Sequence, residues 1–218
     1  MTQLQVLSEE KRELLLEKFQ EDNVLAKKLV KKLTSFLGSY DLDNRRGYKF
    51  ERDGVTVEFV ILSSTDNKVQ VTYTNADEEE KVTGSVVVET NGKFVLKGYE
   101  VIENEVVKTR EMEVTEEFLT PSTEENLELP ETREEVRESV PCIYGNWCGP
   151  GCSGPSAPIS PVDSCCKTHD KCYGSVGYFA CSCDRKLQDC LWPHTQNGSE
   201  WAIAVSAWFD LQWCNPFK

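Results

Sequence analysis

The sequence predicts a chain of two domains, in which an α+β domain (a helix plus an antiparallel meander) precedes a small all-α, disulfide-rich domain. The 218 residues suffice for two small domains. All ten cysteines, all five tryptophans and both histidines lie at or after Cys142. The charge divides at the same place, since residues 1–140 carry a net charge of −12 and residues 141–218 a net charge of −1. We expect an acidic non-catalytic domain at 1–114, an acidic linker at 115–140 and the cysteine-rich domain at 141–218.

One amphipathic helix is expected at the start of the first domain. Ser8 and the two glutamates after it are typical of an N-cap with acidic residues in the first turn. Apolar residues then recur at helical spacing until Gly38 ends the run. They are Leu15, Phe19, Ala26, Leu29, Leu33 and Leu37. The run predicts a helix of about eight turns.

From Tyr48 onward the hydrophobic period changes to two, which predicts strands. The expected strands and turns are 55–61 and 68–73 around Asp66-Asn67, 86–88 and 94–96 around Asn91-Gly92, and 106–114. Asn-Gly between two such runs is a strong hairpin signal, so we expect an antiparallel meander. The domain contains no constellation of catalytic residues, and we interpret it as a folded, non-catalytic module.

Composition also limits partners and compartment. The acidic balance argues against nucleic acid as a partner, because phosphates attract a basic face. No run of about 18 apolar residues is present, and the first ten residues lack the features of a signal peptide. Ten cysteines in the 77 residues from Cys142 are nevertheless typical of an oxidised, secreted scaffold. Cysteine usage therefore favours a secreted or extracellular protein, although no signal peptide is visible.

Four cysteines predict a stapled helix hairpin. Cys165 and Cys172 are seven residues apart, as are Cys183 and Cys190, so each pair shares one face of a helix. The segment 174–177 between them suits a tight reversal. Antiparallel partners keep a constant sum of residue numbers, and Cys165 with Cys190 and Cys172 with Cys183 both give 355. Two disulfides would then fix the register of the helices.

That register brings Asp184 within about two residues, or roughly 3 Å of helical rise, of His169. A carboxylate beside an imidazole fixes its tautomer and stabilises its protonated form, as a general base requires. A surface ion pair is the commoner arrangement, but the stapled frame favours a catalytic pair. Asp170 stays free for another task. The glycine-rich segment 144–152 can turn carbonyl oxygens inward, and with Asp170 it can form a calcium site, although such a loop is more often only a turn.

At these residues the chain resembles the secreted phospholipases A2. Tyr-Gly-Asn-Trp-Cys-Gly-Pro-Gly at 144–151 is similar to the calcium loop of that family. The string at 163–173, with Cys-Cys-x-x-His-Asp-x-Cys-Tyr, is similar to its active-site helix, and 181–185 to the start of its second long helix. The resemblance covers about 50 residues and none of the first domain.

The resemblance implies calcium-dependent hydrolysis of the sn-2 ester of glycerophospholipids, with transient contact to a membrane surface. One Ca²⁺ ion would be bound by the carbonyls of Trp147, Gly149 and Gly151 and the carboxylate of Asp170. In the catalytic group His169 would activate water, Asp184 would orient His169, Tyr173 would hydrogen-bond Asp184, and the Gly149 amide would stabilise the oxyanion with the metal. Cys148 would bridge to Cys166. The remaining cysteines, Cys142, Cys152, Cys181 and Cys214, have three possible connectivities.

The chain also departs from the family pattern. Only eleven positions separate Cys172 from Cys183, so the β-wing between the two helices is missing. Cys152 stands where the last glycine of the loop is usual, and an acidic linker replaces the short helix ahead of the loop. These departures concern interfacial binding and lipid preference, and leave the His169 and Asp184 pair intact.

Alternatives concern the cysteines and the ends of the chain. A zinc cluster could use His169 with Cys165, Cys166 and Cys172, but the helix hairpin explains these cysteines better. The domain could instead be a secreted antimicrobial or toxin peptide, carried behind an acidic leader or immunity module. Such a peptide does not need three acid-base residues together. The apolar residues Trp201, Val205, Trp208 and Phe209 form either core or a membrane face, with core favoured. The acidic first domain could restrain the hydrolase.

Overall fold

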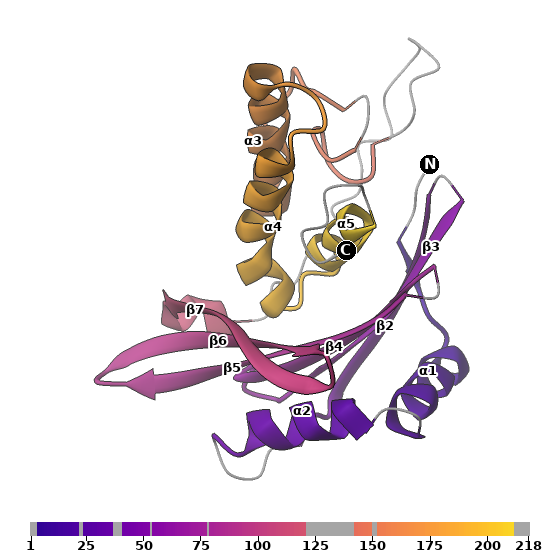
Figure 1. Cartoon of the computed structure of the whole chain (residues 1–218), viewed down its shortest axis with the longest axis vertical. Helices are drawn as coiled ribbons and strands as arrows, with labels where there is room; N and C mark the ends of the chain where they lie inside the picture. The colour runs from indigo at the N-terminus through magenta and orange to yellow at the C-terminus, as the bar shows by residue number, and fades with distance from the viewer. Residues whose placement is uncertain are drawn as a thin grey trace. The chain divides into compact units, whose positions relative to one another are not determined.

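The computed structural model describes residues 4–21, 24–36, 41–52, 54–77, 79–120, 142–149 and 152–211. The chain divides into two compact units, one formed mainly by residues 4–122 and the other mainly by the residues that follow (Figure 1). The first unit is a sheet with helices, and the second is helical and disulfide-bonded. The fold class expected from the sequence is confirmed.

The sheet is an antiparallel meander in which neighbours in sequence are neighbours in space. Its strands are β1 (Gln5–Val6), β2 (Asn44–Arg52), β3 (Val55–Ser63), β4 (Val69–Ala76), β5 (Glu79–Thr90), β6 (Lys93–Ile102) and β7 (Glu105–Val114). Asn91 and Gly92 both have positive φ, 53° and 73°, which a two-residue hairpin turn between β5 and β6 requires. Both predicted hairpins and the strand at 106–114 are confirmed, whereas β1 was not predicted.

The single helix of about eight turns is a wrong prediction. The structure describes two helices, α1 (Glu9–Glu21) and α2 (Val24–Thr34), which contact each other on one face of the sheet (Figure 1). The sequence between them is Asp22-Asn23, two residue types that favour caps and turns over helix interiors. Leu29 and Leu33 of α2 are fully buried in a core with Val71 and Tyr73 of the sheet. The expected helix end at Gly38 lies outside the described residues.

The segment after β7 contains a short 3-10 helix, η1 (Glu116–Leu119). Most of the predicted linker, from residue 121 onward, lies outside the described residues. Within the described ranges, no helix combines the length and the apolar character needed to cross a membrane.

The helical unit consists of α3 (Pro161–Val176), α4 (Cys181–Gln196) and α5 (Glu200–Asp210) (Figure 1). The side chain of Ser160 caps α3 by accepting the Asp163 N–H, and Pro161 occupies the first turn, where its missing N–H is not needed. Helix α3 continues to Val176, so the reversal lies at 177–180, a few residues later than the sequence predicts. On α5, Trp201 stacks on Tyr144 at 4.9 Å between ring centroids, which supports core packing for this helix.

Four disulfides join described residues of this unit. Cys165–Cys190 and Cys172–Cys183 link α3 to α4, so the pairing from the constant sum is confirmed. The Cys148–Cys166 bridge, expected from the family resemblance, is also present. Of the pairings left open, Cys142 joins Cys152. Cys181 is disulfide-bonded as well, and Cys214 lies outside the described residues.

Candidate active site

His169 on α3 and Asp184 on α4 form a buried hydrogen-bonded pair. His169 Nε2 lies 2.7 Å from Asp184 Oδ1, and the His169 side chain is only 5% exposed. The hydroxyl of Tyr173, one helical turn after His169, donates to the same oxygen at 2.5 Å. The Cys172–Cys183 disulfide is adjacent in sequence to both Tyr173 and Asp184, so a covalent staple fixes the two helices where these side chains meet.

The environment of Tyr173 keeps its hydroxyl a donor. Burial, assisted by the hydrogen bond to Asp184, raises the pKa of the Tyr173 phenol well above its ordinary value. The Tyr173 ring packs against the His169 ring at 4.2 Å between centroids, and the edge of the Phe209 ring from α5 meets the imidazole at 5.1 Å. Phe209 was not predicted to touch the site. The helical spacing of the aromatic residues on α5 marked it only as core or membrane face.

The carboxylate of Asp170 lies beside this pair, with one oxygen unsatisfied. Its Oδ1 lies 3.9 Å from His169 Nδ1, the ring nitrogen that Asp184 does not occupy. Its Oδ2 is buried with no hydrogen-bond partner. The pKa of Asp170 is raised from 3.8 to about 6, chiefly by burial; a hydrogen bond with Ser153 lowers it in part, and the charge of Asp163 adds a smaller increase. Because a buried, unpaired carboxylate oxygen is unfavourable, this position favours a bound cation.

The loop at 142–149 lies beside α3 and supplies backbone oxygen atoms. Trp147 and Gly149 are partly buried, and Gly149 has a φ of 115°. The Gly149 carbonyl accepts the Cys152 N–H at 3.1 Å and keeps a second lone pair. The third predicted carbonyl ligand, Gly151, lies outside the described residues. One carboxylate with backbone carbonyls is a hard-oxygen donor set of the kind that calcium takes.

Metals that use side-chain clusters are not favoured by the described part of the chain. There, no group of three or more His, Cys, Asp or Glu side chains is placed to hold a metal ion. A calcium site with a single carboxylate would not form such a group. The zinc alternative is contradicted at its ligands, because Cys165, Cys166 and Cys172 are all in disulfides.

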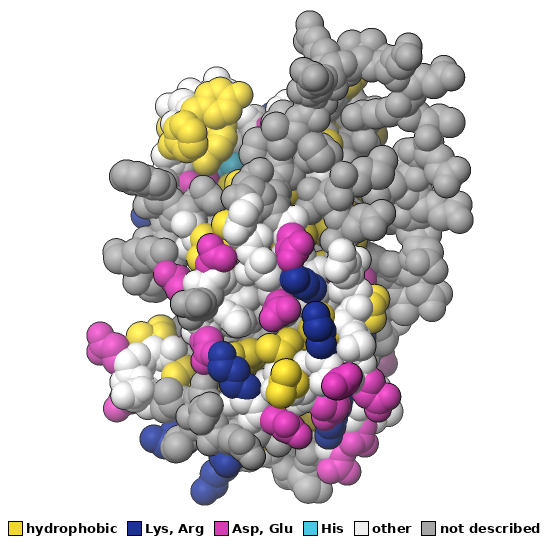
Figure 2. All heavy atoms as spheres, turned by 90° about the vertical axis from the view of Figure 1, so that its right-hand side faces the viewer, with side chains coloured by type: hydrophobic (Ala, Val, Ile, Leu, Met, Phe, Trp, Pro, Cys, Tyr) yellow, Lys and Arg dark blue, Asp and Glu magenta, His cyan; other side chains and the backbone are white. Residues whose placement is uncertain are grey.

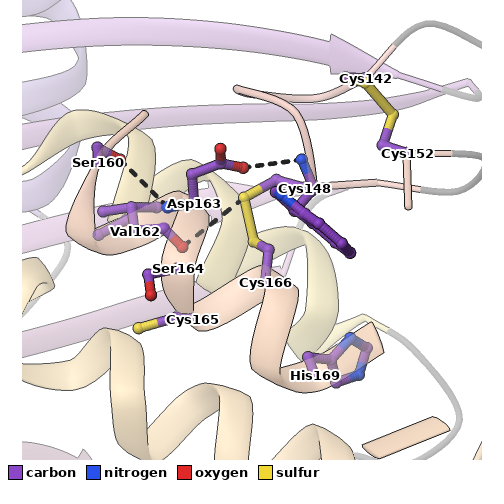
Figure 3. Close-up of a disulfide and its surroundings, with 12 residues drawn as sticks. Cys142, Cys148, Cys152, Ser160, Val162, Asp163, Ser164, Cys165, Cys166 and His169 are labelled. Atoms are coloured by element: carbon purple, nitrogen blue, oxygen red, sulfur yellow. Dashed lines mark hydrogen bonds between the residues drawn. A yellow bond between two sulfur atoms is a disulfide. The ribbon is translucent and has the colours of Figure 1, made fainter. Parts of the chain in front are cut away.

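Asp163 connects the loop to the first turn of α3, as Figure 3 shows. Its carboxylate is fully buried and accepts hydrogen bonds from three backbone N–H groups, those of Asn146 at 3.0 and 3.1 Å, Trp147 at 2.8 Å and Ile159 at 3.0 Å. A Cβ at Gly145 would lie 2.4 Å from Asp163 Cγ, so only glycine permits this approach. Sequence reasoning placed Asp163 in the helix motif without a role. Its position three residues after the Ser160 N-cap was the available signal.

Two further contacts hold the same loop. The Cys148–Cys166 disulfide joins it covalently to α3 one helical turn from His169 (Figure 3). The ammonium group of Lys167 lies 4.8 Å from the centre of the Trp147 ring. Asp163, the disulfide and Lys167 therefore fix the loop to the helix that carries His169 and Asp170.

Similar proteins are found for the C-terminal part of the chain. The "Acidic phospholipase A2 beta-bungarotoxin A6 chain" of Bungarus multicinctus is 36% identical over 80 residues, which cover 33% of this chain and 56% of the relative. The "Acidic phospholipase A2 homolog taipoxin gamma chain" of Oxyuranus scutellatus scutellatus is 38% identical over 60 residues, 24% of this chain and 38% of the relative. "Probable phospholipase A2 homolog 1" of Oryza sativa subsp. japonica is 36% identical over 56 residues, 25% of this chain and 41% of the relative.

The chain spans about half the length of the curated relatives it matches. No protein-family model matches the chain, and no solved structure matches it significantly. The relatives' names include phospholipases A2 and phospholipase A2 homologs. Together with the disulfides, these matches confirm the resemblance drawn from the sequence.

Proposed function

We propose that this chain, whose C-terminal part is a phospholipase A2-like domain, hydrolyses the sn-2 ester of glycerophospholipids with calcium as its cofactor. One observation supports this most directly. The buried His169–Asp184 pair lies next to Asp170, a carboxylate with an unsatisfied buried oxygen. A general base beside a cation site is the pair of groups that ester hydrolysis by water requires.

In this proposal His169 is the general base. Its Nε2 is held by Asp184, so its Nδ1 faces the position where water would lie and can accept a proton from it. The Asp184 carboxylate then stabilises the imidazolium that forms. Tyr173 donates to the same Asp184 oxygen and keeps that carboxylate in place. The proton would pass from His169 to the leaving alcohol when the tetrahedral species collapses.

The Asp170 carboxylate and the carbonyls of Trp147 and Gly149 would hold the calcium ion, with Gly151 as the further ligand that the sequence predicts. When bound, calcium polarises the ester carbonyl and stabilises negative charge on its oxygen. The backbone N–H of Gly149 would donate a second interaction to that oxygen. Rings from Phe209 and Tyr173 pack against the imidazole.

Secretion is the compartment that this proposal favours. The disulfides of the helical unit form and persist in oxidising surroundings. Substrate would be presented as a lipid surface, and no nucleic-acid partner is proposed for so acidic a chain.

The test is release of fatty acid from phospholipid vesicles by the full, oxidised chain, with calcium and with a calcium chelator. We expect hydrolysis that needs calcium and that His169→Gln abolishes without changing the disulfides. Release of the sn-2 fatty acid together with a lysophospholipid that keeps its sn-1 chain would identify the bond. Vesicle leakage without fatty-acid release, equal with and without calcium, would instead support a membrane-active peptide and overturn the proposal.

A further inference from the structure

The connection between α3 and α4 is an exposed apolar tip, formed by Val176, Gly177, Tyr178 and Phe179. Phe179 is 81% exposed, Tyr178 79% and Val176 63%, which places them among the most exposed large apolar residues described. Figure 2 shows the corresponding cluster of hydrophobic side chains protruding at the upper left of that view. Single exposed apolar residues are common on proteins, but three on four consecutive positions at one helix end form a patch that needs an explanation.

The backbone holds the tip in an unusual conformation. Phe179 has a φ of 63°, in the left-handed region that bulky residues rarely adopt, and Gly177 before it has a φ of 113°. Left-handed backbone at a phenylalanine is unfavourable by about 1 kcal/mol or more. Such a conformation persists only where the surrounding structure, here two helices joined by disulfides, holds it in place. The Cys172–Cys183 disulfide joins the helix before the tip to the helix after it. The tip is therefore a short connection, held at both ends, whose aromatic residues are exposed to solvent.

The tip is continuous with the candidate active site. The Tyr178 ring lies 5.6 Å from the ring of Tyr173, whose hydroxyl donates to Asp184. Val176 is seven residues after His169 on the same helix, which is about 10 Å along the axis and on nearly the same face. Insertion of the tip into a lipid surface would therefore place lipid about 10 Å along the helix from His169.

Basic residues flank the tip in sequence. Lys171 on α3 and Arg185 and Lys186 at the start of α4 are exposed. The acidic residues of the same stretch are Asp170 and Asp184, which face the site rather than the surface of the tip. Of the five basic residues after residue 140, three lie between 171 and 186, and the exposed Asp189 of α4 follows one turn later. Apolar side chains flanked by exposed cations are the pattern of a segment that enters an anionic lipid surface.

We propose that this tip is the segment through which the chain enters an anionic phospholipid surface, with Val176, Tyr178 and Phe179 in the acyl boundary and Lys171, Arg185 and Lys186 on the headgroups. The proposal rests on the proposed hydrolase function, since it names the surface that delivers substrate to that site.

The test separates membrane binding from hydrolysis. Binding is measured by sedimentation with vesicles of diether phosphatidylglycerol or diether phosphatidylcholine, which contain no ester to hydrolyse. The variant Val176→Gln/Phe179→Asn removes apolar surface while respecting the backbone, because glutamine suits a helix end and asparagine tolerates positive φ. Tyr178 is kept, since it contacts Tyr173. Leu14→Gln on α1, which removes a 64% exposed apolar side chain from the other unit, is the matched control.

We expect the parent chain to partition onto the anionic vesicles. The double variant should lower that partition by about 10- to 100-fold, as the removal of two partly inserted apolar side chains implies. Arg185→Gln/Lys186→Gln should lower it by about 10-fold or more on phosphatidylglycerol and leave phosphatidylcholine unchanged. Leu14→Gln should have no effect on either.

Hydrolysis of a short-chain phospholipid dispersed below its micelle concentration should be the same in the parent and in the double variant. Loss of activity there in both chains would reject the proposed function while leaving the binding result interpretable. Equal vesicle partition of the parent and the Val176→Gln/Phe179→Asn chain would overturn the membrane role. So would a change of oligomeric state in that variant without a change in partition, which would assign the tip to a second copy of the chain.

Discussion

Asp163→Asn isolates the contact that holds the loop at 142–149 against α3. Asparagine has nearly the size of aspartate, so the change alters hydrogen bonding and leaves packing intact. The parent carboxylate is fully buried, where it accepts the N–H groups of Asn146, Trp147 and Ile159. An asparagine offers one oxygen and one NH₂ group, and the NH₂ group cannot accept a hydrogen bond.

The magnitude follows from which oxygen each donor uses. Trp147 donates to Oδ1 and Ile159 to Oδ2, while the Asn146 N–H is shared between them. Whichever way the amide turns, one of the Trp147 and Ile159 donors faces an NH₂ group. A hydrogen bond to a charged group contributes about 1.5–3 kcal/mol, and a buried unsatisfied donor costs about 1–3 kcal/mol. We expect the free energy of unfolding of the helical unit to fall by about 2–4 kcal/mol.

Urea unfolding followed by tryptophan fluorescence measures this quantity in the full chain. All five tryptophans lie at or after Trp147, so the signal reports on the helical unit and not on the sheet. Lys171→Gln, which changes an exposed side chain of α3, should stay within about 0.5 kcal/mol of the parent. Gly145→Ala disrupts the same contact from the loop, because residue 145 has a φ of 61° and an added Cβ would lie 2.4 Å from Asp163 Cγ. It should lower the free energy of unfolding by a comparable amount. An Asp163→Asn chain as stable as the Lys171→Gln chain would refute the reasoning.

Three further predictions concern calcium and the acidic unit. Asp170→Asn should remove most activity while leaving the disulfides and fold intact, because an amide cannot replace the only side-chain charge on the ion; unchanged calcium dependence of the rate would contradict the assignment. Burial raises the pKa of Asp170 from 3.8 to about 6, so the free energy of unfolding of the calcium-free chain should fall as pH rises from about 4 to about 6. Below about pH 6 calcium must displace a proton from Asp170, so calcium affinity should fall about tenfold per pH unit. Calorimetric titrations with calcium at pH 5, 6 and 7 measure this affinity. Cleavage of the chain within 115–140 should raise the rate of hydrolysis on anionic vesicles, and raise it less at high salt. The acidic first unit is tethered at high effective concentration and its charge repels anionic surfaces. Equal rates at low salt before and after cleavage would rule out restraint by this unit.

The parts of the fold that the sequence predicted are those that local chemistry decides. Asn91-Gly92 supplies positive φ at two consecutive positions, so its hairpin and the strands beside it follow from the turn alone. The spacing of Cys165, Cys172, Cys183 and Cys190 fixes helix faces and register together, and with them the meeting of His169 and Asp184. Such a register needs no knowledge of long-range packing.

The parts that were missed depend on packing that a pattern does not record. Asp22-Asn23 lowers helix propensity only slightly, and the division into α1 and α2 goes with both helices contacting one sheet. Asp163 looks the same in the sequence whether it faces solvent or three backbone N–H groups. Tyr178 and Phe179 are residue types that are often buried. Their exposure becomes visible only in the structure, where both lie between the end of α3 and the start of α4.

Helix α3 carries the loop anchor, the candidate calcium ligand, the candidate base and the exposed tip at intervals that its own geometry sets. Asp163, which holds the loop, and Asp170, the candidate calcium ligand, are seven residues apart and therefore about 10 Å apart on one face. His169 and Val176 have the same spacing, so the candidate base and the exposed tip share a second face. Shortening the connection to α4 leaves both intervals unchanged, because they lie within one helix. For this reason a chain without the β-wing can keep the loop anchor and the candidate base in place, while the free helix end stays available for the lipid contact that we propose.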